Sequence, residues 1–164
     1  MSPDALFQIA NPLALSGWVA LAASPLRPQA LTLYAGRIVP LALAVLYTAL
    51  VLVGWSGAEG GFGSLPDVMR LFDDATVALA GWVHYLGFDL FVGAWAVETA
   101  RREGIRHLLV LPCLILIFLF GPAGFLAFLI LRAGFTARIS IGPYQAVRRL
   151  RVLSVSVIKA TARK

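Results

Sequence analysis

Charged residues are scarce in this sequence. Asp, Glu, Lys and Arg make up 13% of the 164 residues, whereas soluble globular domains usually contain about 25%. Hydrophobic residues account for 60% of the chain. A soluble domain of this size would leave much of that apolar surface in contact with water, so the composition favours an integral-membrane protein. The length leaves no room for a separate soluble catalytic domain.

Residues for metal and nucleotide chemistry are also lacking. Cys113 is the single cysteine, so neither an intrachain disulfide nor a cysteine zinc site can form. His84 and His107 are too few for a membrane di-iron site, which takes most of its ligands from imidazoles. The sequence has no glycine-rich phosphate loop followed by Lys and no Gly-x-Ser-x-Gly nucleophile motif. We therefore expect neither a metal nor a cofactor.

Long apolar windows are the main positive feature. A helix needs about 20 apolar residues to cross the hydrocarbon core, and suitable windows lie at 5–26, 38–58, 75–97 and 108–131. Short connections favour antiparallel neighbours. The sequence therefore predicts an all-α, polytopic membrane protein, with a four-transmembrane-helix bundle in a domain at 5–135. The glycine-rich connection 57–74 is predicted to contain a short interfacial helix at 67–72.

Basic residues follow the last apolar window. Residues 136–164 are predicted to form a basic C-terminal tail or interfacial helix. We expect Arg148, Arg149 and Arg151 to contact anionic lipid headgroups, at roughly 1 kcal/mol per basic residue near the surface. No aromatic or glycine pattern accompanies these arginines, so nucleic acid is not an expected partner. For four spans, the balance of basic residues favours a cytoplasmic location for both termini.

The third window contains an ionisable cluster. Asp89 lies deep in the span, where an acidic side chain costs about 2.5–3.5 kcal/mol on insertion scales, so it should face the bundle interior. Tyr85 lies one helical turn earlier and shares its face. A neighbouring aromatic row is formed by His84, Phe88, Phe91 and Trp95. Together the two rows are predicted to line a long apolar cleft with acid–base groups at one depth.

The cluster has two interpretations. In the first, Asp89, His84 and Tyr85 exchange protons with a ligand. In the second, Asp89 forms a hydrogen bond to Asn11, His84 or Tyr85 and holds the bundle together. The residues predicted to contact a ligand are Asn11, Trp82, Phe88, Phe91, Trp95, Gly121 and Pro122.

Gly121 and Pro122 interrupt the fourth window. Proline removes a backbone donor and clashes with the preceding turn. The interruption is predicted to be either a kink with close helix packing or a widened place that lines a pocket.

The sequence resembles the abscisic-acid-deficient-four-like family, which are membrane proteins linked to neoxanthin synthesis in plants, with bacterial relatives. The resemblance rests on HYLGFDLFVG at 84–93, followed by FGPAG at 120–124 and Arg132. FQIAN at 7–11, GW at 17–18, Pro25 and Trp95 add to it. It covers roughly residues 6–133. A bacterial inner membrane is the expected location.

The resemblance implies four helices and a role in carotenoid biosynthesis. In plants the family is tied to conversion of a carotenoid 5,6-epoxide into an allenic end group, an isomerisation that needs a base and an acid but no redox cofactor. By this analogy Asp89 is the base and His84 or Tyr85 is the acid. Two alternatives remain open. One is a non-catalytic carotenoid- or quinone-binding subunit of a larger membrane complex, and the other is a small proton-coupled transporter that would have to form homo-oligomers.

Overall fold

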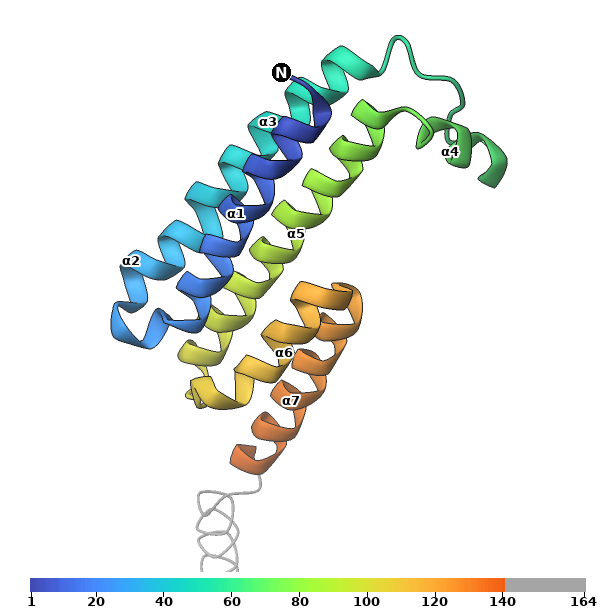
Figure 1. Ribbon diagram of the computed structural model, residues 1–164. Coiled ribbons are helices and arrows are strands. Elements are labelled where there is room, and N and C mark those ends of the chain that lie inside the picture. The colour runs from blue at the N-terminus through green and yellow to red at the C-terminus, as the bar shows by residue number, and fades with distance from the viewer. Residues whose placement is uncertain (141–164) are drawn as a thin grey trace, which may run out of the picture. The chain divides into compact units, whose positions relative to one another are not determined.

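The computed structural model describes residues 1–140, and every regular element in this range is a helix (Figure 1). Arg148, Arg149 and Arg151 of the predicted tail lie outside the described residues. The chain separates into two compact units, Met1–Phe128 and Leu129–Lys164. The elements in order are α1 (Pro3–Ala22), the 3-10 turn η1 (Ser24–Leu26), α2 (Pro28–Leu33), the π-helical turn η2 (Tyr34–Ile38), α3 (Val39–Gly54), α4 (Leu65–Leu71), α5 (Ala75–Arg102), α6 (His107–Phe120) and α7 (Pro122–Ser140).

Three apolar helices of the first unit are long enough to cross a membrane. They are Pro3–Ala22 with 20 residues, the continuous rod Pro28–Gly54 with 27, and Ala75–Arg102 with 28. At about 1.5 Å per residue each reaches the roughly 30 Å of the hydrocarbon core. The second helix was predicted to begin at residue 38, but it begins at Pro28, because proline suits the first helical position. The all-helical architecture is confirmed for the described residues, and three of the helices are long and apolar enough to span a membrane.

The structure does not confirm a fourth span at 108–131. This window divides at Gly121, whose φ of +40° lies where residues with a side chain are disfavoured. The 14 residues of α6 rise only about 21 Å. A side chain on Gly124 would overlap the backbone of Leu116 and Ile117, so α7 begins in close contact with α6. Figure 1 shows the chain reversing direction between α6 and the first turns of α7, and we call α6, this turn and residues 122–128 the α6–α7 hairpin.

Helix α5 packs against α1, α3 and α6. Small residues allow these helices to approach, as is common within membranes. A Cβ on Gly36 would lie 2.8 Å from the Cβ of Ala94, so the π-turn η2 fits directly against α5. Asp74 caps the N-terminus of α5 by accepting from the backbone N–H of Thr76 at 2.8 Å and of Val77 at 3.0 Å. Helix α5 therefore positions side chains toward three different neighbours.

Candidate functional site

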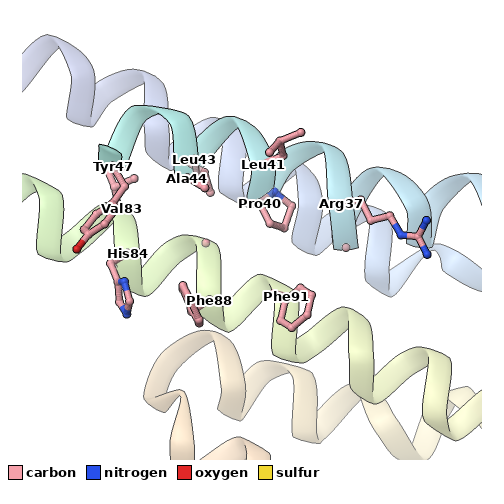
Figure 2. Close-up of a pocket in the computed structure, with 12 residues that line it drawn as sticks. Arg37, Pro40, Leu41, Leu43, Ala44, Tyr47, Val83, His84, Phe88 and Phe91 are labelled. Carbon is pink, nitrogen blue, oxygen red and sulfur yellow. The ribbon is translucent and has the colours of Figure 1, made fainter. Parts of the chain in front are cut away.

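An apolar groove of about 480 Å³ lies between the α3 side and the α5 side of the first unit (Figure 2). Its rim is open, since Leu41, Phe88 and Phe91 are 67%, 60% and 55% exposed. In a membrane this opening would face lipid, so an apolar molecule could enter sideways from the bilayer. The groove is lined by Gly36, Arg37, Pro40, Leu41, Leu43, Ala44, Tyr47, Val83, His84, Gly87, Phe88 and Phe91.

Polar groups occur at two places in this groove. Figure 2 shows Tyr47 of α3 beside His84 of α5, and their ring centroids are 5.5 Å apart. His84 also stacks on Phe88, with centroids 4.4 Å apart and planes inclined by 20°. Arg37 of η2 lies at the other end of the groove. A ligand in the groove would therefore meet one hydroxyl, one imidazole and one guanidinium, and otherwise apolar surface.

A second hollow, of about 210 Å³, continues past the Tyr47–His84 pair. It shares these two side chains with the first groove and extends to Trp55 and Phe62, whose rings lie 5.4 Å apart. Measured along the helix from Arg37 to Trp55, the two hollows together follow about 27 Å of the second span. This shape suits a long, thin apolar molecule, and His84 and Tyr47 lie where the two hollows meet.

Tyr85 and Asp89 face a different neighbour, the tip of the α6–α7 hairpin. The Tyr85 hydroxyl donates to the backbone carbonyl of Phe118 at 2.6 Å. That carbonyl belongs to the last turn of α6, where backbone oxygens lack partners within the helix. Oδ2 of Asp89 is buried and has no hydrogen-bond partner within the described residues. The Tyr85 hydrogen bond thus ties the end of α6 to the middle of α5.

Gly121 fits against the Asp89 carboxyl group. A Cβ at Gly121 would lie 2.8 Å from Oδ1 and 2.9 Å from Oδ2 of Asp89. Gly121 also precedes Pro122, the first residue of α7, so the carboxyl group lies at the positive end of that helix. The close approach leaves no room for a ligand between the carboxyl group and Gly121.

The remaining predicted contact residues join helices. Trp82 Nε1 donates to Oδ1 of Asn11 at 3.0 Å, and Asn11 Nδ2 donates to the carbonyl of Phe7 at 2.7 Å, which ties α1 to α5. The Trp95 ring packs against Phe125 and Phe128 of α7, with centroids 5.6 Å apart in both pairs. The first turns of α7, up to Phe128, therefore lie beside α5.

The structure separates the predicted site residues into three groups. His84, Phe88 and Phe91 lie in the groove. Tyr85, Asp89, Gly121, Pro122 and Trp95 belong to the hairpin contact, and Asn11 with Trp82 to the α1–α5 contact. His84 and Asp89, predicted to act together, lie five residues apart and hence about 140° apart around α5.

Two polar groove residues were absent from the sequence prediction, Tyr47 and Arg37. Tyr47 is the single tyrosine of a window without charged residues, and that was the available indication. Within the described residues, no three His, Cys, Asp or Glu side chains are grouped so that they could hold a metal ion.

These features describe a helical protein with three helices long and apolar enough to span a membrane, an apolar groove with an open rim, and a hairpin at the Gly121 break. The model of the ABA DEFICIENT 4-like family matches residues 5–128, and the chain belongs to that family. The matched part contains the groove and the hairpin tip. No curated protein and no solved structure matches the chain. Family membership and the apolar helices are compatible with a membrane protein of carotenoid metabolism.

Proposed function

We propose that this protein binds a carotenoid or a similar long polyene in the groove between α3 and α5 and isomerises it by acid–base chemistry at His84 and Tyr47. The observation that carries the proposal is the pairing of an imidazole and a phenol, with ring centroids 5.5 Å apart, at one end of an apolar groove that is open at its side. Ligand sites are typically apolar with a few placed polar groups, and this groove fits that description.

The open rim supports a ligand that arrives from the bilayer. Phe88 and Phe91 present exposed rings along the groove, and a flat polyene can lie against such faces. Hydrophobic grooves discriminate weakly between similar apolar ligands. The proposal therefore specifies a polyene of carotenoid type, and the reacting end group is set by what His84 and Tyr47 can protonate and deprotonate.

The proposed step is an epoxide-to-allene isomerisation. The neutral His84 imidazole takes a proton from the polyene carbon that becomes the centre of the allene. The C–H electron pair forms a new double bond to the neighbouring epoxide carbon, and the C–O bond of that carbon breaks. The existing double bond stays in place as the other half of the allene. The Tyr47 hydroxyl gives its proton to the epoxide oxygen, which becomes an alcohol. His84 then returns its proton to Tyr47, so the product has the composition of the substrate.

Asp89 takes no part in the proposed proton transfers. The base predicted from the sequence was Asp89, but its carboxyl group packs on Gly121 at the hairpin tip, away from the groove. His84 is the polar group of α5 in the groove. The His84 and Asp89 substitutions therefore distinguish a groove reaction from one at the hairpin tip.

The test is pigment analysis in bacteria engineered to accumulate β-carotene, zeaxanthin or violaxanthin. We expect the wild-type chain to give a new product of unchanged mass from the epoxide violaxanthin. His84→Gln and Tyr47→Phe should each lower its yield by roughly 10²–10⁴-fold, the usual contribution of a general acid or base. Asp89→Asn should retain the product wherever the protein remains folded.

Each other outcome has a definite meaning. Loss of product in folded Asp89→Asn, with activity kept in His84→Gln, would move the chemistry to the hairpin tip. Unchanged pigment that co-purifies with all variants would make the chain a binding subunit without turnover. If a quinone co-purifies in place of pigment, the ligand of the groove is a quinone and the polyene proposal is wrong. Neither product nor bound pigment would refute the proposal for these substrates.

We further propose that the hairpin enters the membrane from the cytoplasmic side and that the N-terminus lies on the opposite side. Basic residues favour cytoplasmic ends. With three crossings and a hairpin, one end of the first unit carries a single arginine, Arg70. The other end carries Arg27, Arg37, Arg101, Arg102 and Arg106. This orientation differs from the one expected for four crossings, in which both termini are cytoplasmic.

Cysteine labelling tests this orientation. In a Cys113→Ala background, Ser2→Cys should react with a membrane-impermeant maleimide in intact spheroplasts. Gln29→Cys, at the other end of the spans, should react after lysis. The reversed pattern would overturn the orientation and leave the groove proposal unaffected.

A further inference from the structure

A basic pocket lies at the end of the first unit where the three spans approach their termini. Arg27, Pro28, Gln29, Ala30 and Arg101 line a hollow of about 450 Å³. Helix α1 ends at Ala22, α2 begins at Pro28, and α5 ends at Arg102. The hollow therefore lies where a membrane span passes from the hydrocarbon core to the headgroup region.

The guanidinium groups of Arg27 and Arg101 are available to bind a ligand in this pocket. Arg27 and Arg101 make no ion pair within the described residues, whereas the neighbouring Arg102 donates to Glu98 at 3.0 Å. Arginine presents a planar array of donors that matches the oxygens of a phosphate. Gln29 adds an amide donor at the same pocket.

An apolar hollow of about 200 Å³ adjoins the basic pocket and shares Pro28 and Arg101 with it. Its walls include Pro25, Val97 and Ile105. Exposed apolar side chains continue along the helix that begins at Pro28, where Leu33 is 46% and Ile38 is 53% exposed. Positive charge next to such a surface suits an amphiphile better than a free anion.

We propose that this pocket binds the phosphate of an anionic phospholipid, whose acyl chains lie along the exposed apolar face of α2 and η2. The bound lipid would fix the junction of α1, α2 and α5 at one membrane surface. Basic pockets between spans on the cytoplasmic side are suited to anionic headgroups. The site is separate from the α3–α5 groove and does not depend on the proposed polyene reaction.

The experiment is native mass spectrometry of the full-length chain in detergent, incubated with equal amounts of phosphatidylglycerol and phosphatidylcholine. We expect the wild type to retain phosphatidylglycerol preferentially. Arg27→Gln with Arg101→Gln should reduce this preference by about fivefold per arginine, as expected for roughly 1 kcal/mol each. Both side chains are exposed, so the double variant should fold, and its melting temperature is measured alongside.

A charge-matched double variant separates the pocket from general attraction. Arg102→Gln with Arg106→Gln removes the same charge at the same end of the spans, and neither residue lines the pocket. This control should keep the lipid preference. Equal losses in both double variants would overturn the proposal in favour of nonspecific attraction. Displacement of the lipid by millimolar inorganic phosphate would overturn it in favour of a free-anion site.

Discussion

Gly121→Ala should destabilise the protein strongly, because two separate features of this position exclude a side chain. Gly121 has φ +40° and ψ −95°, a conformation disfavoured for residues with a Cβ, and residues held in such regions cost about 1–3 kcal/mol each. The new methyl group would also lie 2.8 and 2.9 Å from the Asp89 carboxyl oxygens. Overpacking of this kind typically costs about 1–3 kcal/mol more.

The assay is reversible unfolding of the purified chain in mixed micelles, with Gly134→Ala as the matched control. Gly134 lies within α7, and a Cβ there would meet nothing within 4 Å. Alanine is favoured over glycine inside a helix by roughly 0.5–1 kcal/mol, so the control should be neutral or stabilising.

A double variant separates the two contributions. Gly121→Ala combined with Asp89→Ala removes the carboxyl group, so the steric part of the loss should be recovered while the backbone part remains. If Gly121→Ala and Gly134→Ala have the same free energy of unfolding, the hairpin geometry assigned to this turn is wrong.

Three further substitutions or reagents test individual contacts. Tyr85→Phe should lower stability by about 1–3 kcal/mol, because it leaves the Phe118 carbonyl without its donor; unchanged unfolding would show that water or lipid replaces the hydroxyl. Asn11→Ala should cost about 1 kcal/mol by removing the acceptor of Trp82 Nε1, and Trp82 fluorescence should report the change; an unaltered emission spectrum would contradict the contact. The buried thiol of Cys113 should react with a maleimide only after the protein is denatured, and rapid labelling of the folded protein would show that α6 is not packed as described.

The three long apolar helices were predictable from the apolar runs of the sequence. Such runs have few alternatives to a membrane helix, but the start of the second helix at Pro28 was missed because the predicted window began only at residue 38. The short helix predicted at 67–72 corresponds to α4 at Leu65–Leu71. These elements depend on local sequence, so local rules are sufficient for them.

The hairpin was not predictable, because a glycine and a proline in an apolar run are compatible with a kink as well as a reversal. The backbone angles of Gly121 distinguish these possibilities, and they depend on packing against α5. The same holds for the groove. It requires the π-turn η2 to fit against α5 at Ala94, and no periodicity in the sequence indicates a π-turn.

The division of the acid–base residues was partly predictable. Helical spacing places Tyr85 and Asp89 on one face, and the structure keeps them together at the hairpin. The same spacing places His84 about 140° from Asp89, which argues against one shared site. Tyr47 lies on another helix, and its proximity to His84 follows from the tertiary packing of α3 on α5.

Occupancy of the α3–α5 groove is the central claim, and substitutions that fill it test that claim most directly. Ala44 lines the groove and Ala49 does not, although both are exposed residues of α3. The measurement is pigment bound per protein, by absorbance and mass spectrometry, after purification of Ala44→Trp and Ala49→Trp from carotenoid-producing cells. Loss of pigment from Ala44→Trp, with wild-type occupancy in Ala49→Trp, is the predicted result. Equal pigment in both variants would contradict a polyene site in this groove.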